Sequence, residues 1–424
     1  MSVCYLSLRL ISGFPDAIGW DRLFRMNHQK KSSDRRLTLL LILVFGGVFF
    51  FPISAWWNYS QIQQAEENSN RLLNEEKWGA AEQAARNWTR RAPQNADAWL
   101  ALAEAYRQQQ KFEETAEALG QLSDSDPRIL KTLALRTDLL LAELHDPEKS
   151  LETCRRILKI DPRVDRAWQR LIYINAMMLL RLEMVKQIRQ AIKLQCEPPE
   201  AYVYLLLSDS LNFSNGAPLV NSWLTTHPEN EDLEVARAIY IARSSIRQSM
   251  LLKESQLISG GDQSLITNCL KKYPQNCEVL AYFLEKSLDE GDLKRVAELL
   301  EHVPDNAEAD SRFWRLKGRY LALHDQLDLA ETSFQQALEW NPYDWRARLG
   351  LAEILRRKGA VKEATEMARI GNRGKLFSKK LMELQDPRSI DRDLLQEIGE
   401  YAHDCGDIDV ETSIQRRLNM TPDT

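Results

Sequence analysis

Residues 311–344 constrain the fold more than any other stretch of the chain. Two runs of apolar residues with helical spacing flank a polar break at 324–326, which predicts two helices joined by a tight turn. Gly318 and Ala330 stand where two antiparallel helices must approach closely, and Pro342 ends the unit because it cannot continue a helix. One such hairpin cannot bury both of its faces, so neighbours of the same kind are expected on either side.

The same register recurs from about residue 62 to the C-terminus. We predict helical hairpins at residues 62–95, 96–129, 131–164, 165–198, 199–230, 231–276, 277–306, 311–344, 345–378 and 392–424. The unit 231–276 is about a dozen residues longer than the others, and its excess near 248–262 is expected to form a loop on one face of the array. The repeat array is therefore expected over 58–378, followed by a polar link over 371–380 and a capping hairpin over 379–424.

The capping hairpin differs from the other units in its second helix. Glu411 and Gln415 stand at places 20 and 24, where the other units carry small or apolar residues. A polar second helix is typical of a terminal repeat that faces water.

An uncharged run of 21 residues occupies positions 37–57. As a helix it would span about 31 Å, close to the hydrocarbon thickness of a bilayer, so it is predicted to be a transmembrane anchor. Residues 1–36 hold seven Lys or Arg against three Asp, and Trp56 and Trp57 follow on the other side as an aromatic belt. These flanks predict a cytoplasmic N-terminus and an extracytoplasmic, periplasmic repeat array.

Other interpretations of the N-terminal region stay open. The run 37–57 is also compatible with a cleaved signal peptide, with the cut near Ala55, which would leave a secreted or periplasmic protein. A buried core helix is a further alternative. Met26 opens a well-formed basic leader of its own, so we also expect that translation starts there and not at residue 1.

Charge and motifs argue against most other classes of function. The formal net charge is -5, of which residues 1–36 contribute +4, so the chain from residue 58 onward carries -9. This balance disfavours a nucleic-acid binder. The sequence has no phosphate-binding loop, nucleophile elbow or His-Glu-x-x-His frame, so neither catalysis nor a cofactor is expected. The six Cys form no Cys-x-x-Cys pair and are expected to be free thiols rather than metal ligands. Cys269 and Cys277 are close enough in sequence to bridge in an oxidising compartment, which the sequence leaves open.

The spacing of the packing residues resembles a known family. In residues 311–344, Trp314, Gly318, Ala330 and Phe334 hold places 4, 8, 20 and 24, a pattern similar to the tetratricopeptide repeat. The resemblance covers about residues 62–424. It implies an all-α solenoid of helical hairpins, a right-handed superhelix whose concave face is lined by the first helix of each unit and binds peptides or proteins. The layout as a whole is similar to membrane-anchored bacterial tetratricopeptide proteins.

The resemblance also indicates which residues are available for binding, because places 2, 5, 6, 9, 12 and 13 of each first helix line the concave face in this family. Two neighbouring units carry arginines at these places: Arg312, Arg315, Arg319, Arg346, Arg356 and Arg357. Arginine grips carboxylates bidentately, so we predict that these residues bind an acidic or C-terminal peptide segment. The alternative is that they are solvated arginines paired with nearby acids such as Glu353. A second candidate surface is formed by Arg166, Arg170 and Tyr173 in the unit 165–198.

The function expected from these features is a non-catalytic protein-interaction scaffold tethered to a membrane. The alternative is a subunit of a cell-envelope assembly, such as polysaccharide export or the maturation of cytochromes and other cofactor proteins. The oligomeric state and the partner's identity are not encoded in any pattern of this sequence.

Overall fold

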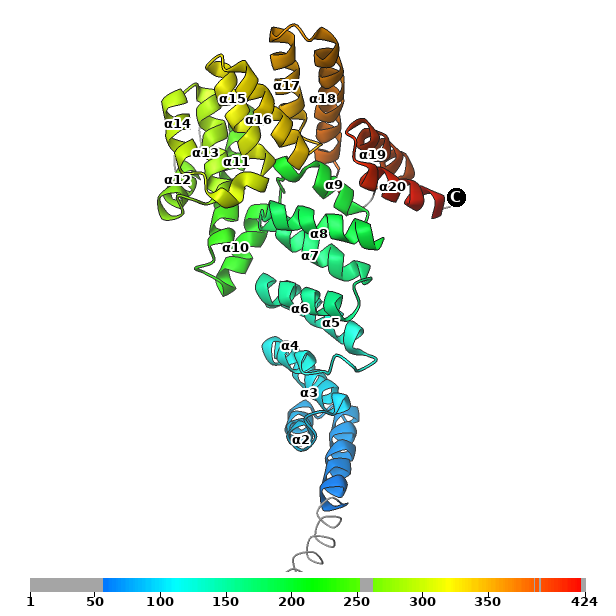
Figure 1. The fold of residues 1–424 in the computed structure, drawn as a ribbon. Helices are drawn as coiled ribbons and strands as arrows, with labels where there is room; N and C mark the ends of the chain where they lie inside the picture. The colour runs from blue at the N-terminus through cyan, green and yellow to red at the C-terminus, as the bar shows by residue number, and fades with distance from the viewer. Residues whose placement is uncertain (1–55, 252–261, 385, 389, 421–424) are drawn as a thin grey trace, which may run out of the picture. The chain divides into compact units, whose positions relative to one another are not determined.

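The computed structural model describes residues 56–251, 262–384, 386–388 and 390–420. Within these residues the regular structure is helical throughout, with no strand (Figure 1). The chain divides into two compact units, Met1–Pro93 and Gln94–Thr424, and each is described by itself.

The first unit contains the predicted hairpin of residues 62–95. A helix over residues 56–74 precedes α2 (Trp78–Arg91), and the two are joined by a turn in which Glu76 has a φ of 56°. Ala81 and Ala85, at places 20 and 24 of the repeat register, are fully buried together with Trp88. These are the small positions at which the sequence predicts close helix packing.

The predicted anchor at 37–57 lies outside the described residues except for its last two positions. Trp56 and Trp57 open the helix over residues 56–74 and are exposed. In the described part of the chain, no helix is both long enough and apolar enough for a membrane crossing.

The second unit is a succession of helical hairpins that follows the predicted register. Its elements are α3 (Ala96–Gln108), α4 (Phe112–Gly120), α5 (Ile129–Ala142), α6 (Pro147–Ile160), α7 (Asp165–Met177), α8 (Arg181–Leu194), α9 (Glu200–Leu206), η1 (Ser208–Ser210), α10 (Gly216–Thr226), α11 (Glu231–Leu251), α12 (Asp262–Lys272), α13 (Cys277–Glu290), α14 (Leu293–Glu301), η2 (Asp305–Ala309), α15 (Ser311–Leu323), α16 (Leu327–Trp340), α17 (Trp345–Arg357), α18 (Val361–Met382), α19 (Arg392–Asp404) and α20 (Ile408–Met420). The two helices of each predicted hairpin pack together except in the unit 199–230, where α9 contacts α7, α8 and η1 while α10 packs against α11. The all-α solenoid predicted from the repeat is therefore confirmed.

The hairpin of α15 and α16 shows why the register predicts the packing. Phe334 is buried, and an added Cβ on Gly318 would lie only 3.0 Å from its ring. Asp325 closes the predicted turn with a φ of 60°, and Ala330 is fully buried between the helices. The small and large residues of the pattern are thus the two sides of one close helix contact.

Two regions differ from the sequence-based expectation. The predicted polar link at 371–380 is helical, because α18 continues without a break to Met382. Gly374 lies where α18 meets the first helices on either side, and an added Cβ there would come within 2.9 Å of the Trp345 Cβ. In the long unit, α11 extends to Leu251, so the predicted loop at 248–262 starts later than expected, and residues 252–261 lie outside the description.

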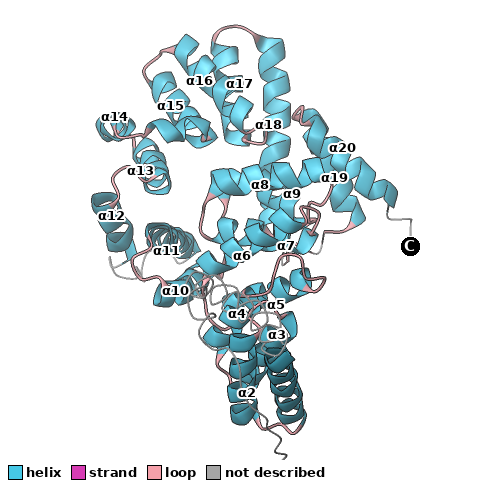
Figure 2. Cartoon of the chain, turned by 60° about the horizontal axis from the view of Figure 1, so that its bottom comes forward, coloured by secondary structure: helices cyan, strands magenta, loops and turns pink. Residues whose placement is uncertain are grey.

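The array also folds back on itself, which the repeat pattern does not predict. α20 packs against α8, so the last hairpin lies beside the middle of the array (Figures 1 and 2). Arg189 on α8 pairs with Asp407 at 2.6 Å, and Ser413 on α20 donates to the buried Glu197 at 2.6 Å. The polar second helix therefore exposes Gln415 as predicted, but it buries its opposite face instead of ending the array in water.

Candidate functional site

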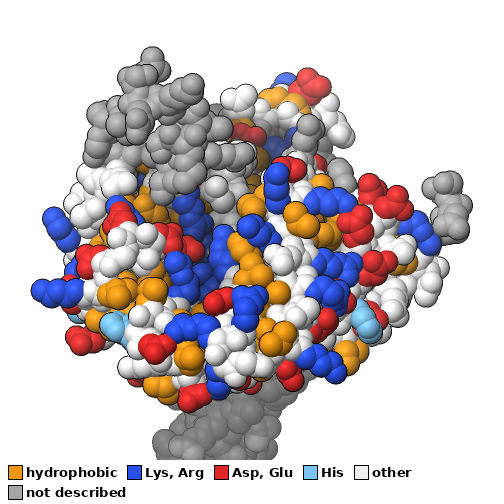
Figure 3. All heavy atoms as spheres, turned by 90° about the horizontal axis from the view of Figure 1, so that it is seen from above, with side chains coloured by type: hydrophobic (Ala, Val, Ile, Leu, Met, Phe, Trp, Pro, Cys, Tyr) orange, Lys and Arg blue, Asp and Glu red, His pale blue; other side chains and the backbone are white. Residues whose placement is uncertain are grey.

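The predicted arginine surface lies on α15 and α17, the first helices of two consecutive units. α13, α15 and α17 pack in succession. Figure 3 shows Lys and Arg side chains gathered in a hollow on one face of the second unit, with Asp and Glu side chains nearby. The individual arginines differ in how deeply they are buried and in whether they already have an ion-pair partner.

Arg312 is held inside the protein by two carboxylates. Its Nε donates to Asp310 Oδ1 at 2.9 Å, and its Nη1 donates to Glu278 Oε2 at 3.0 Å. The side chain is 5% exposed. These two carboxylates outweigh the effect of burial and raise the pKa of Arg312, so the guanidinium stays charged and bonded within the chain.

Arg315 is buried in the same way on the next turn of α15. Its Nε donates to Asp344 Oδ2 at 2.9 Å, and its Nη1 lies 3.6 Å from Glu285 Oε1. Asp310 and Asp344 also cap helices, since Asp310 accepts from the Arg312 backbone N–H and Asp344 accepts from that of Ala347. The boundary acids of the repeats therefore fix both the helix starts and the buried arginines.

Three of the other predicted arginines are paired on the surface. Arg319 donates to Asp289 at 2.8 Å, Arg356 pairs with Glu353, and Arg357 pairs with Asp325. The pair of Arg356 with Glu353 is the one that the alternative interpretation of the sequence names. Exposed pairs of this kind are weak and exchange readily with a ligand's carboxylate.

Arg346 differs from the other five. In the described part of the chain it makes no hydrogen bond or ion pair, and its guanidinium lies over the Trp345 ring at 4.3 Å. Burial lowers the pKa of Arg346, and the Arg315 guanidinium lowers it further. A desolvated, unpaired guanidinium gains more from an incoming carboxylate than a paired one does.

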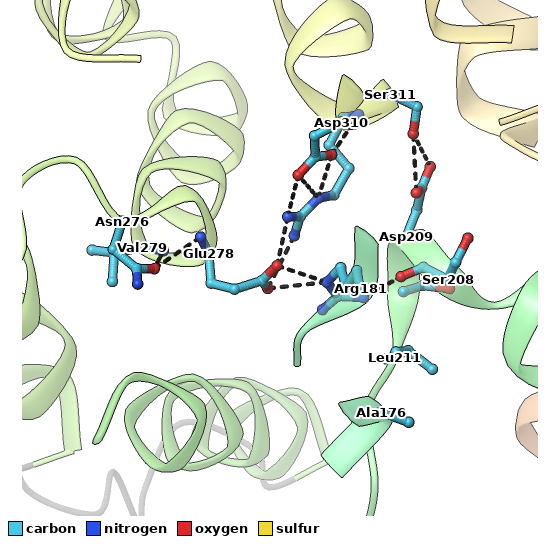
Figure 4. A network of polar contacts seen from close by, with 12 residues as sticks. Ala176, Arg181, Ser208, Asp209, Leu211, Asn276, Glu278, Val279, Asp310 and Ser311 are labelled. Atoms are coloured by element: carbon cyan, nitrogen blue, oxygen red, sulfur yellow. Dashed lines mark hydrogen bonds and ion pairs between the residues drawn. The ribbon is translucent and has the colours of Figure 1, made fainter. Parts of the chain in front are cut away.

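Glu278 forms the centre of a junction that sequence reasoning missed (Figure 4). From the first turn of α13 its carboxylate accepts from Arg181 Nε on α8 at 2.9 and 3.0 Å, and from Arg312 on α15. Burial raises the pKa of Glu278, but Arg181 and Arg312 outweigh burial and hold it at about 2. Arg181 lies 97 residues before Glu278, and no repeat spacing links the two positions.

The second candidate surface lines a hollow in the second unit of about 1590 Å³ in volume. Arg166, Arg170 and Tyr173 of α7 form part of its wall. It is also lined by Leu381 and Met382 at the end of α18 and by Leu384, Asp386, Pro387 and Arg388 beyond that helix. Arg166 and Arg170 both donate to Asp138 at 2.8 Å, so two cations share one carboxylate. Tyr204 and Phe213, whose rings meet edge to face, add aromatic wall.

The structure offers little for metal or thiol chemistry. Among the described residues, no three His, Cys, Asp or Glu side chains gather where they could hold a metal ion. Cys269 and Cys277, whose bridge the sequence leaves open, are both free thiols here. Burial raises the pKa of each of them, so neither is an activated nucleophile.

Two segments of the chain, residues 67–128 and 315–369, match the tetratricopeptide repeat family. They include the unit at 96–129 and most of the two units that carry the predicted arginines, so the register used above is the register of the family. No curated protein matches the chain.

Several solved structures align with this chain at low similarity. A tetratricopeptide repeat protein from Parabacteroides merdae is 12% identical, with a TM-score of 0.27, covering 70% of this chain and 99% of that one. The Cut9–Hcn1 assembly of the APC/C is 13% identical, with a TM-score of 0.32, covering 87% and 80%. Yeast Tom70 is 12% identical, with a TM-score of 0.27, covering 86% and 93%. The repeat assignment rests on the matched segments and on the packing described above.

Proposed function

We propose that this chain is a non-catalytic scaffold that binds a protein partner along the inner surface of its first helices. Tetratricopeptide repeats generally act as interaction scaffolds rather than as enzymes. The observation that carries the proposal is the hollow of about 1590 Å³ beside α7 and α9, which is large enough for an extended peptide segment.

The chemistry of the hollow favours a segment that carries both acidic and apolar side chains. Tyr173, Tyr204 and Phe213 supply broad surfaces for apolar contact. Arg163 also lines the hollow, and within the described residues its exposed side chain has no ion-pair partner. Together with Arg346 on α17, these groups support an acidic partner, as the arginine pattern predicts.

The test is affinity capture with the full chain, using variants that separate the hollow from the rest of the surface. Tyr173→Glu adds a like charge and removes an apolar contact, so it should abolish capture of an acidic segment. Arg295→Glu changes an exposed arginine that is paired with Glu298 on α14, outside the hollow and outside the predicted arginine surface, and should leave capture intact. Equal capture by both variants would overturn the hollow as the binding surface. Recovery of envelope synthesis or transport subunits would indicate the envelope-assembly alternative.

The charged patch on α17 is tested separately. Arg346→Glu should weaken capture of an acidic partner, because it removes the unpaired guanidinium and adds a negative charge. Arg295→Glu is again the control, since Arg295 is exposed, paired with Glu298 and outside the predicted arginine surface. If the Arg346 variant captures the partner as well as the wild type does, the acidic segment does not use α17.

The membrane tether is a further part of the proposal. The uncharged run at 37–57 and the basic residues before it support a single-pass anchor with the array on the extracytoplasmic side. A reporter fused after residue 424 should be active only outside the cytoplasm, and activity only inside would overturn the orientation. N-terminal sequencing of the mature protein distinguishes an anchor from cleavage near Ala55.

A further inference from the structure

A separate pocket of about 360 Å³ lies where α8 and η1 meet the start of α15 and the end of α16. Val185, Leu205 and Pro342 form apolar wall, and Trp340, which is half exposed, stands at its edge. None of these residues takes part in the hollow beside α7 or in the arginine surface. The pocket is therefore a different site with a different lining.

Asp209 of η1 is an acidic residue of this pocket that forms no ion pair within the described residues. Its two carboxylate oxygens accept from Ser311 Oγ at 3.1 and 3.0 Å (Figure 4). Across the described residues, no Lys, Arg or His forms an ion pair with it. The Asn341 side chain also hydrogen-bonds Asp209 and lowers its pKa, but neither this amide nor the Ser311 hydroxyl carries a positive charge.

Each of the other charged side chains that line the pocket lies near a group of opposite charge, although Arg181 Nη2 is buried without a hydrogen-bond partner among the described residues. Arg181 pairs with Glu278 at 2.9 Å, and Arg189 pairs with Asp407 at 2.6 Å. Lys186 lies 3.6 Å from Glu183, and Asp310 is bonded to Arg312. Asp209 is thus the lining charge that lacks a counter-ion in the described structure.

The electrostatics agree with this geometry. Burial and the carboxylate of Asp344 raise the pKa of Asp209 to about 6. Arg315 and Arg312 act in the opposite direction, but they are already bonded to Asp344, Asp310 and Glu278. Near neutral pH the Asp209 carboxylate is ionised and poorly compensated, so the site favours an added cation.

We propose that this pocket binds a lysine or arginine side chain of a protein partner, with the cationic head beside Asp209. The aliphatic stem would lie against Val185 and Leu205, and the Trp340 ring offers a face for the cation. An anionic ligand fits less well because it would lie beside the ionised carboxylate of Asp209. The inference rests on the proposed scaffold function, and it adds a basic contact on the partner to the acidic segment proposed above.

Three small probes test the proposal directly on the full chain in detergent. They are N-acetyl-lysine amide, N-acetyl-arginine amide and the uncharged N-acetyl-norleucine amide, each titrated by ligand-observed NMR. At least one cationic probe should bind about tenfold or more tightly than the norleucine probe, because only a cation makes a charged hydrogen bond to Asp209. Comparison of the lysine and arginine probes shows which side chain the pocket prefers.

Two variants assign the binding to this pocket. Asp209→Asn keeps an acceptor for Ser311 but removes the charge, so it should lower the affinity for the cationic probe by about tenfold or more. Ala309→Phe fills the pocket without altering Asp209 and should also abolish binding. Asp289→Asn, at an exposed pair with Arg319, is the matched control and should bind like the wild type.

The pH dependence gives an independent readout. Cation affinity should fall between about pH 7.5 and about pH 5, as Asp209 takes up a proton. Equal binding of the norleucine probe, unchanged binding by Asp209→Asn, or no binding of either cationic probe would each overturn the inference. Tyr173 lies outside this pocket. Partner capture with Tyr173→Glu therefore tests the scaffold proposal independently of cation binding beside Asp209.

Discussion

Arg315 donates through Nε to Asp344 Oδ2 at 2.9 Å, and neither side chain is more than 3% exposed. The bond joins the first helix of one repeat to the helix-capping acid of the next. Asp344 at the same time accepts from the backbone N–H of Ala347 at 2.9 Å, which starts α17. One buried carboxylate thus fixes both the start of a helix and the contact between two repeats.

Arg315→Met should destabilise the second unit strongly. The change leaves Asp344 buried without its cation, for which the cost is about 3–5 kcal/mol in the free energy of unfolding. Urea denaturation followed by circular dichroism measures the loss. Arg319→Met removes an exposed arginine from the same helix and should cost less than about 1 kcal/mol.

Adding Asp344→Asn to Arg315→Met should recover part of the loss, since Asn still caps α17 but carries no charge. If the double variant is no more stable than the single one, uncompensated charge is not the cause.

Gly350→Ala should disturb the packing between α16 and α17. An added Cβ would lie 2.5 Å from the Phe334 ring, which is buried, so the ring or the helix must move. Overpacking of this kind costs about 1–3 kcal/mol. Gly79→Ala is the control, because a Cβ at Gly79 meets nothing within 4 Å and alanine favours the helix. Phe334→Leu should compensate for Gly350→Ala in a double-mutant cycle, and simple additivity of the two losses would contradict the proposed clash.

The hairpins could be predicted from the sequence because their packing residues recur at fixed spacing. Gly318, Ala330 and Phe334 each occupy the place that the register assigns, and each is buried in one helix contact. The same reasoning assigned Arg312 and Arg315 to the binding surface, since the register describes which way a residue faces and not what it meets. The capping acids Asp310 and Asp344 at the unit boundaries were the available signal for buried pairing.

The contacts that fold the array back on itself could not be predicted in this way. Arg189 and Asp407 are 218 residues apart, and Arg181 and Glu278 are 97 apart. Repeat spacing predicts only contacts between neighbouring units. Single charged residues at such separations leave no periodic signal, so the Glu278 junction and the Asp209 pocket emerge only in three dimensions.

Glu278→Gln should destabilise the protein at neutral pH but not in acid. The pKa of Glu278 is held at about 2 in the folded chain, below the ordinary value of 4.5, because Arg181 and Arg312 outweigh burial. A lowered pKa contributes stability above the unfolded value, and this contribution disappears as the pH falls from about 4.5 towards about 2. The expected cost at neutral pH is about 2–3 kcal/mol.

Urea denaturation of wild type and Glu278→Gln across this pH range measures the effect, and the two stabilities should converge in acid. Glu298→Gln, at an exposed pair with Arg295, is the control and should stay close to the wild type throughout. A constant difference between wild type and Glu278→Gln at all pH values would show that the loss comes from packing and not from charge.

Asp209→Asn should have the opposite effect and stabilise the protein above about pH 6. The pKa of Asp209 is raised to about 6 by burial and by Asp344, so its ionised form costs folding free energy. The cost is fully present above the folded pKa and disappears as the pH falls from about 6 towards the unfolded value of 3.8. Asn keeps the bond from Ser311 without the charge, so we expect a gain of about 1–2 kcal/mol near pH 7.5 and little change near pH 4.

Urea denaturation of Asp209→Asn measures this gain in the free energy of unfolding. The control variant Asp289→Asn should lie within about 0.5 kcal/mol of the wild type. A loss of stability at pH 7.5 would instead mean that Arg312 and Arg315 already compensate Asp209, and the case for a cation in the adjoining pocket would fail with it.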